Sequence, residues 1–286
     1  MKKQWLFVLS LFTVLTMSAQ NIIELPVWPD GQKESNEITE PEVTDKEGGR
    51  VRNVSVASMK VFPADQSKNT GIAILICPGG GYALQAAAHE GTQFAEWYAA
   101  NGITAVVLRY RLPNKHHDIP LKDAQEAMRV IRKNAAAWGV DPQKVGVSGF
   151  SAGGHLASTL LTHYDQSSRP DFGILFYPVI SMKESLTHAG SRKNFLGTGY
   201  NKELVRLYSN EEQITKDTPT TLLLLSDDDK AVVPENSTLF YNALKENGIP
   251  ASLYIFPTGG HGWGFNSSFK YHEEMKSLVL HWVLKK

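Results

Sequence analysis

Gly149-Phe150-Ser151-Ala152-Gly153 is the stretch that decides the fold of this chain, because its surroundings turn a short pattern into a structural prediction. Residues 144–150 form an apolar, strand-like run, and the small residues after the serine are typical of a helix start. A serine at such a strand-to-helix turn has a strained backbone and projects clear of the sheet. The pattern therefore predicts a nucleophilic Ser151 at a strand end, provided that the chain also supplies its chemical partners.

Strand-like and helix-like segments alternate around this stretch, from about residue 51 to the end of the chain. Several of the strand-like segments are unbroken apolar runs, which indicates strands buried on both faces of a sheet. Helical spacing appears within 121–135 and 239–248, and again from about residue 268. The alternation predicts an α/β fold with a mostly parallel, doubly wound sheet and helices on both faces. The expected strands are residues 54–62, 72–77, 103–110, 144–150, 172–177, 221–226 and 252–256.

Residues 180–218 interrupt this alternation with a long polar stretch between two expected strands. Connections of this length are usually lids or substrate-binding loops, so we expect a lid-like insertion with short helical pieces, one of them at 202–208. A plain helical crossover with poor periodicity is the alternative.

The first 50 residues divide into a predicted signal peptide and an arm. Two lysines precede an apolar stretch that is too short to cross a bilayer comfortably, and Met17-Ser18-Ala19 is typical of a cleavage site. We therefore expect residues 1–19 to be a signal peptide and the mature protein to be secreted or periplasmic, with no membrane association. Residues 20–50, rich in Pro and Gly, are expected to form an irregular N-terminal arm before one large catalytic domain at 51–286.

The composition narrows the classes of partner. The chain has 286 residues, 42% of them hydrophobic, and a formal net charge of zero, which argues against nucleic acid as the partner. Cys77 is the single cysteine, so an intrachain disulfide is excluded despite the predicted export. The sequence does not indicate an oligomeric state.

Ser151 needs a general base, and that base needs an orienting carboxylate. Where a serine sits on a strand-to-helix turn of this kind, the acid and then the histidine follow it in the chain. Asp229 and His261 each follow an expected strand, so they should lie at the same edge of the sheet as Ser151. Asp227, Asp228 and Asp229 are consecutive; Asp229 is favoured because it directly precedes a short turn, and Asp228 is the alternative.

An acyl-transfer reaction also needs donors for a developing oxyanion. The glycines of Pro78-Gly79-Gly80-Gly81-Tyr82 follow the expected strand at 72–77, where backbone N–H groups can point at the oxyanion. The expected donors are Gly80 or Gly81 together with Ala152. Tyr82 and Trp263 are candidate substrate-binding aromatic residues; the alternative for Trp263 is packing within its loop. This chemistry needs no metal or organic cofactor.

Five motifs in this order resemble those of a known group of enzymes. They are PGGGY (78–82), HEG (89–91), GFSAGGHLA (149–157), DDDKAVVPENS (227–237) and GGHGWG (259–264). The chain resembles the secreted acetyl xylan esterase and feruloyl esterase-like α/β-hydrolases of polysaccharide-degrading bacteria, which are akin to prolyl peptidase catalytic domains. One departure is Pro78, where lipases carry the histidine of an HGGG loop. The resemblance implies an α/β-hydrolase fold with Ser151 as nucleophile, Asp229 as acid and His261 as base.

Together these features lead us to expect a secreted serine esterase that removes acyl groups, above all acetyl, from plant-type polysaccharides or oligosaccharides. A feruloyl esterase and a prolyl-type peptidase are the alternatives, although a prolyl peptidase usually carries a further propeller domain. A sugar-binding protein without catalysis is a third possibility, and it predicts a missing member of the serine–aspartate–histidine set. Members of the resembling group are often called xylanases, but glycosidic cleavage usually takes two carboxylates across the sugar.

Overall fold

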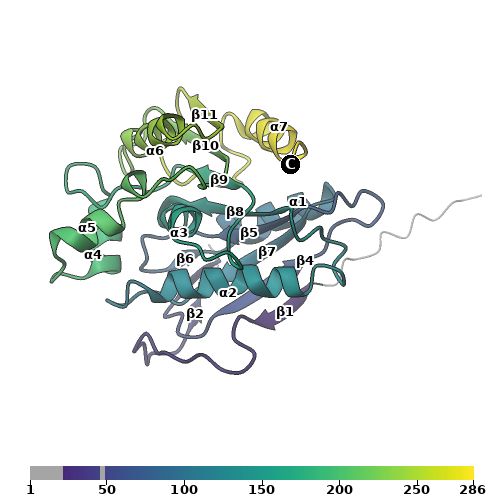
Figure 1. The fold of residues 1–286 in the computed structure, drawn as a ribbon, viewed down its shortest axis with the longest axis horizontal. Helices are drawn as coiled ribbons and strands as arrows, with labels where there is room; N and C mark the ends of the chain where they lie inside the picture. Colours follow the sequence, from purple (N-terminus) through teal and green to yellow (C-terminus); the bar gives the residue numbers. More distant parts are fainter. Residues whose placement is uncertain (1–21, 46–48) are drawn as a thin grey trace, which may run out of the picture.

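The apolar runs predicted as strands form a central eight-stranded sheet in the computed structural model, which describes residues 22–45 and 49–286 (Figure 1). The strand order is β1-β4-β7-β5-β8-β9-β10-β11. All neighbours from β7 to β11 are parallel, whereas β4 is antiparallel to both β1 and β7. The predicted mostly parallel sheet is confirmed. The seven expected strands are β4 (Ser58–Phe62), β5 (Ala73–Cys77), β7 (Thr104–Arg109), β8 (Val145–Phe150), β9 (Gly173–Phe176), β10 (Thr221–Ser226) and β11 (Ala251–Phe256).

Helices cover both faces of this sheet, and each face has its own apolar core. On β5, Leu75 packs into one core and Ile74 and Ile76 into the other, as the two-residue period of a strand requires. The helices α2 (Ile119–Lys133), α3 (Ser151–Thr162) and α6 (Glu235–Glu246) pack into the Leu75 core. The helices α1 (Gln93–Ala100) and α7 (His272–Val283) pack into the other. The final helix thus begins four residues after its expected start near residue 268.

The N-terminal arm contains short strands that the sequence pattern did not reveal. β1 (Ile23–Pro26) pairs antiparallel with β4 at the edge of the main sheet. β2 (Val43–Thr44), β3 (Arg50–Arg52) and β6 (Gln85–Ala86) form a separate three-stranded sheet. These strands are too short to show a two-residue period, so only the pairing in space identifies them. The predicted signal peptide lies outside the described residues.

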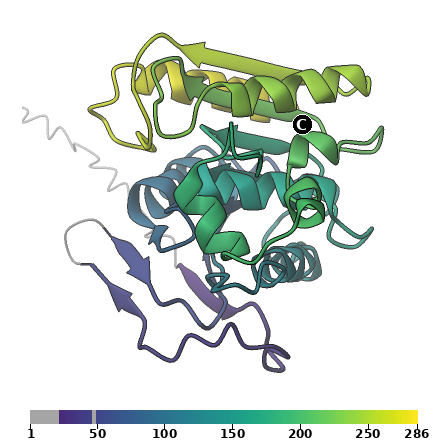
Figure 2. The ribbon, with the colours of Figure 1, turned by 90° about the vertical axis from the view of Figure 1, so that its left-hand side faces the viewer.

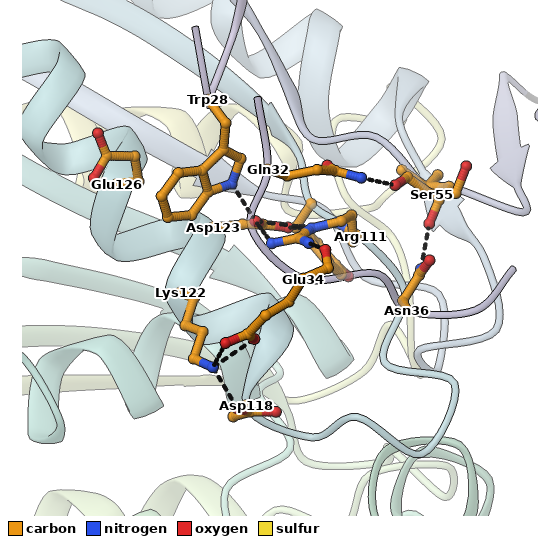
Figure 3. Close-up of polar contacts among 12 residues, drawn as sticks. Trp28, Gln32, Glu34, Asn36, Ser55, Arg111, Asp118, Lys122, Asp123 and Glu126 are labelled. Carbon is orange, nitrogen blue, oxygen red and sulfur yellow. Dashed lines mark hydrogen bonds and ion pairs between the residues drawn. The ribbon is translucent and has the colours of Figure 1, made fainter. Parts of the chain in front are cut away.

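A buried ion pair fastens this arm to the domain (Figure 3). The Arg111 guanidinium donates to both carboxylate oxygens of Asp123 on α2, and both side chains are almost fully buried. From the arm, Trp28 Nε1 donates to Asp123 at 2.8 Å, and the Glu34 carbonyl accepts from Arg111. The buried Asn36 amide donates to a backbone carbonyl at Leu112, 2.8 Å away. The arm is therefore held by contacts between segments that lie far apart in the sequence.

The expected insertion at 180–218 contains α4 (Ala189–Leu196), α5 (Lys202–Leu207) and a 3₁₀ turn at Asn210–Glu212. Figure 2 shows it in green, facing the viewer between the purple N-terminal strands and the yellow C-terminal part. Asn194 on α4 donates from Nδ2 to the Gly81 carbonyl at 2.8 Å, which joins the insertion to the glycine loop. Within the described residues, no helix has the length and apolar content that crossing a membrane requires.

Candidate active site

Ser151 occupies the turn between β8 and α3 with a positive φ of 52°, a strained conformation for a residue with a side chain. Two glycines permit the close approach of strand and helix. A Cβ on Gly149 would lie 2.2 Å from the Gly153 carbonyl, and a Cβ on Gly153 would lie 2.1 Å from the Cys77 carbonyl. The glycines at these two positions are thus required by packing, which is the physical basis of the five-residue pattern.

The structure brings Ser151, His261 and Asp229 together in one hydrogen-bonded chain. His261 Nε2 lies 2.8 Å from Ser151 Oγ, and His261 Nδ1 lies 2.6 Å from Asp229 Oδ2. The Asp229 side chain is buried, and its other oxygen accepts from the backbone N–H groups of Ala231 and Val232. The carboxylate therefore holds Nδ1 protonated and leaves Nε2 free to accept the serine proton.

The neighbouring Asp228 has a different partner. Its Oδ1 accepts from the Gly260 N–H at 2.8 Å, so this exposed carboxylate fastens the loop that carries His261. Of the two alternatives that the sequence left open, the structure places Asp229, and not Asp228, against the imidazole.

The glycine loop after β5 lies beside Ser151, as the sequence predicted. Within the described residues, the N–H groups of Gly80, Gly81 and Ala152 have no hydrogen-bond acceptor. Ala152 lies in the first turn of α3, whose N-terminal end carries a partial positive charge. Both glycines have positive φ, and a Cβ on Gly80 would lie 2.2 Å from the Leu84 carbonyl. These amides are thus available to an anion that forms at Ser151.

A buried carboxylate, Glu90, connects the glycine loop to the His261 loop. Its Oε2 accepts from the Gly79 N–H at 2.8 Å, and its Oε1 accepts from the Tyr177 hydroxyl at 2.9 Å. That hydroxyl accepts in turn from the Gly264 N–H at 2.9 Å. Burial, reinforced by the Glu90 carboxylate, raises the pKa of the Tyr177 hydroxyl well above its usual value, so the hydroxyl remains a donor. Glu90 is therefore a positioning residue for both loops.

A pocket of about 540 Å³ opens over Ser151, a size that is usual for small-molecule sites. Its walls come from the glycine loop, the His261 loop, the start of α4 and the three-stranded sheet. Burial, together with the nearby His261, lowers the pKa of the half-buried His188 at the start of α4. The lining includes Arg50, Gly80, Gly81, Leu84, His89, Glu90, Ser151, His188, Asn194 and His261.

Neither aromatic candidate for substrate binding lines this pocket. Tyr82 is 2% exposed, stacks on Phe195 and bonds through its hydroxyl to His155 Nδ1. Trp263 is 5% exposed, and its ring stacks parallel to that of Phe269 with the ring centroids 4.3 Å apart. Its Nε1 donates to the Ser226 hydroxyl. Both rings are almost fully covered by neighbouring side chains, so neither presents an open face to the pocket over Ser151.

Several residues of the pocket were missed from the sequence, among them Arg50, Glu90, His188 and Asn194. For Glu90 a signal existed, because His89-Glu90-Gly91 belongs to the motifs that carry the resemblance. The other three lie in the arm or the insertion, where no local pattern shows which residues face Ser151.

This arrangement can perform acyl transfer. His261 can take the proton from Ser151 as its Oγ attacks a carbonyl carbon, and the free amides of the glycine loop and Ala152 can hold the resulting oxyanion. Within the described residues, no cluster of three or more His, Cys, Asp or Glu side chains could hold a metal ion.

The parallel sheet, the serine at its strand-to-helix turn and the adjoining histidine–aspartate pair define an α/β-hydrolase of the serine hydrolase class. The chain belongs to the prolyl oligopeptidase family, whose family model matches residues 109–286.

Three similar proteins fall within the group that the sequence motifs indicated. An acetyl ester-xyloside bifunctional hydrolase from Caldicellulosiruptor lactoaceticus superposes with a TM-score of 0.78 at 37% identity, covering 91% of this chain and 94% of that one. An acetylxylan esterase from Xylanibacter ruminicola is 40% identical over 75% of this chain and 45% of its own length. An endo-1,4-beta-xylanase B from Butyrivibrio fibrisolvens is 38% identical over 66% of this chain and 32% of its own length. This chain thus spans less than half the length of these two curated relatives.

Proposed function

We propose that this protein is an exported serine esterase that removes acetyl groups from plant-type polysaccharides or their oligosaccharides. The observation that carries the proposal is the hydrogen-bonded chain from Ser151 Oγ through His261 to Asp229, beside three free backbone amides. Similarity to proteins named acetylxylan esterase and acetyl ester-xyloside hydrolase supports acetylated xylan as the substrate class. Export rests on the sequence of residues 1–19 alone.

In the proposed mechanism, Ser151 attacks the ester carbonyl while His261 Nε2 takes the hydroxyl proton. The oxyanion accepts hydrogen bonds from Ala152 and from Gly80 or Gly81, and loss of one such donor typically costs about 10²–10³ in kcat. The protonated imidazole then gives its proton to the departing sugar oxygen, leaving an acyl-enzyme. Water then attacks the acyl-enzyme while His261 takes its proton, and that proton returns to Ser151 Oγ as acetate is released. The reaction should slow in acid, because only neutral imidazole can accept the serine proton.

The carboxylates of the site favour ester cleavage over glycosidic cleavage. Glycosidases usually place two carboxyl groups across the sugar ring, one of them as an acid. Among the described residues that line the pocket, Glu90 is the one carboxylate, and both of its oxygens already accept hydrogen bonds. Asp229 lies beneath the pocket, bonded to His261.

Release of acetate from acetylated xylo-oligosaccharides tests the proposal, with ferulate release from a feruloylated arabinoxylan fragment measured alongside. We expect acetate release that disappears in Ser151→Ala, while the circular dichroism spectrum of the variant stays unchanged. Ferulate release without acetate would keep the mechanism and replace the acyl group. Cleavage of a proline dipeptide amide alone would replace the esterase by a peptidase, and failure of Ser151 to react with a fluorophosphonate would overturn catalysis altogether.

A further inference from the structure

A second cavity adjoins the pocket over Ser151 at the glycine loop, whose residues line both. It has a volume of about 550 Å³, close to that of the first. Ala83 and Asn194 line both cavities, so the two form neighbouring compartments along one surface. Asn194 also bonds the Gly81 carbonyl, which places the boundary between the compartments directly beside the expected oxyanion donors.

Several segments that are distant in the sequence line the second cavity. The arm contributes residues 37–40, and Asn53 follows directly after β3. The loop after β7 contributes Leu112, Asn114 and Lys115, and the end of α4 contributes residues 193–194 and 197–198. The glycine loop forms the remaining wall through Tyr82 and Ala83.

Backbone strain is concentrated around this cavity. Apart from glycines, seven residues of the described chain have a positive φ. Two of them, Ser151 and Tyr177, belong to the site already described. The other five all line the second cavity: Glu37, Asn53, Tyr82, Asn114 and Lys115. Residues held in sparsely populated conformations cluster at functional sites, because surrounding structure must hold them there at a cost in stability.

The arm wall of the cavity is rigidly attached. The buried Asn36, next to the strained Glu37, donates to the Leu112 carbonyl, and its own carbonyl accepts from Asn114 Nδ2 at 2.8 Å. The Arg111–Asp123 pair anchors the preceding arm residues (Figure 3). A polar wall fixed in this way is preorganised, and preorganisation lowers the entropic cost of binding a ligand.

The side chains that face this cavity suit a neutral, hydroxyl-rich ligand. Glu37 and Glu40 are balanced by Lys115 and Lys193, so the charged groups cancel. Within the described chain, neither lysine forms an ion pair, whereas Glu37 lies 3.5 Å from His116. The amides of Asn53, Asn114 and Asn194 each donate one N–H to a backbone carbonyl, and their side-chain oxygens can accept from a ligand. Such a mixture of donors and acceptors matches sugar hydroxyls better than it matches a single anion or cation.

We propose that the second cavity is a binding subsite for a neutral oligosaccharide chain, and that it holds sugar units next to the one that carries the acyl group at Ser151. This inference rests on the proposed function, because it extends the same substrate across the boundary at Ala83 and Asn194. It assigns recognition of the sugar chain to the arm, the Asn114–Lys115 loop and the end of α4, apart from the residues that do the chemistry.

The test compares acetylated xylo-oligosaccharides of increasing length. Lys193→Ala removes an exposed donor from the last turn of α4, and Lys245→Ala is its matched control in the last turn of α6. Thr39→Trp fills the cavity from the arm side. We expect Lys193→Ala and Thr39→Trp to raise KM for acetylated xylohexaose by about threefold to tenfold more than for acetylated xylobiose, as loss of one or two hydrogen bonds implies. The control should match the unaltered protein at both lengths.

Direct binding separates failure of this inference from failure of the proposed function. Calorimetry of the Ser151→Ala protein with unacetylated xylohexaose and mannohexaose does not depend on ester hydrolysis. Binding of either hexaose that weakens with Lys193→Ala supports the subsite even if no acetate is ever released from sugars. Deacetylation with equal KM at every length, or hexaose affinity that neither Lys193→Ala nor Thr39→Trp changes, overturns it.

Discussion

The two cavities beside the glycine loop are built in different ways. The pocket over Ser151 takes its reacting groups from turns that directly follow β8, β10 and β11, so parallel strands bring them to one edge. The second cavity shares the glycine loop with the first, but its other walls come from the arm, loops and the insertion, none of which belongs to the parallel sheet. The difference indicates that the sheet supplies the chemistry, whereas irregular segments held by distant contacts supply recognition.

His155 connects the insertion to the glycine loop. Its Nε2 lies 2.9 Å from the Tyr208 carbonyl in the insertion, so this nitrogen carries the proton. Its Nδ1 therefore accepts from the Tyr82 hydroxyl, at 2.8 Å, in the glycine loop. The neutral ring satisfies both partners, and burial lowers its pKa to about 4.

The largest effect is expected on the chemical side of the comparison. Asp229→Asn should lower kcat for an acetyl ester by about 10⁴-fold, because the imidazole then loses the carboxylate that holds its tautomer. Asp228→Asn is the matched control, and it should cost no more than a few-fold, since that residue bonds only the loop backbone. Steady-state kinetics of both variants check this. Equal losses in the two would show that the consecutive aspartates share the role.

The next largest effect is expected on the free energy of unfolding, through the ion pair that holds the arm beside the second cavity. Asp123→Asn should lower the free energy of unfolding by about 3–5 kcal/mol, because it leaves the buried Arg111 guanidinium without its counter-charge. Asp118→Asn, at the exposed start of the same helix, breaks only a surface ion pair with Lys122 and should cost less than about 1 kcal/mol. Urea denaturation measures both. A small loss for Asp123→Asn would mean that the arm is fastened by its apolar contacts instead.

The buried His155 should make the folded protein less stable in acid. Between the usual pKa of about 6.5 in the unfolded chain and about 4 in the folded protein, only the unfolded chain takes up the proton. The contribution of the neutral His155 ring to the free energy of unfolding is fully present above pH 6.5. About 3 kcal/mol of it is lost as the pH falls to 4.

Urea denaturation across that pH range measures the loss. His155→Gln should flatten the pH profile, because an amide can bond both partners without titrating. His281→Gln, on the exposed side of α7, serves as the control and should leave the slope as it is. An unchanged slope in His155→Gln would assign the acid sensitivity to other groups.

The smallest expected effect tests how the chemical side is held in place. Glu90→Gln leaves either the Gly79 N–H or the Tyr177 hydroxyl without an acceptor, so the glycine loop and the His261 loop should shift. We expect kcat to fall by about 10²-fold with little change in KM, as a small displacement of positioned groups implies.

Glu96→Gln on the exposed face of α1 is the control for this variant. A change in KM alone, with kcat preserved, would make Glu90 a substrate-binding residue and not a positioning residue. Recovery of activity in Glu90→Asp would also argue against a strict geometric role, because the shorter carboxylate cannot reach both donors.

Much of the chemical side could be predicted from sequence, for a physical reason. Apolar runs mark the buried strands, and the C-terminal ends of parallel strands share one edge of the sheet. The positions of Ser151, Asp229 and His261 just past such runs were therefore enough to bring them together. The sequence left Asp228 as an alternative to Asp229, because the choice depends on one turn of backbone after β10.

The aromatic residues show where this reasoning fails. Tyr82 and Trp263 stand next to site residues in the sequence, but their rings turn into the core, where packing and hydrogen bonds to His155 and Ser226 satisfy them. Adjacency along a chain does not determine the direction of a side chain in a loop. Glu90 was missed because its two partners, the Gly79 N–H and the Tyr177 hydroxyl, come from other segments of the chain.

The sequence by itself determined the parallel sheet, the helices on its two faces and the reacting serine, acid and histidine, since these depend on local periodicity and chain order. Tertiary structure alone decided the hydrogen bonds of Glu90 to two loops, the hydrogen bonds of His155 to the glycine loop and the insertion, and the second cavity. Trp28 and Asp123 are 95 residues apart in the sequence, and the other contacts of the arm also join residues far apart in the chain. No local pattern encodes such a pairing. These features arise only when the packed sheet brings distant segments within hydrogen-bonding distance.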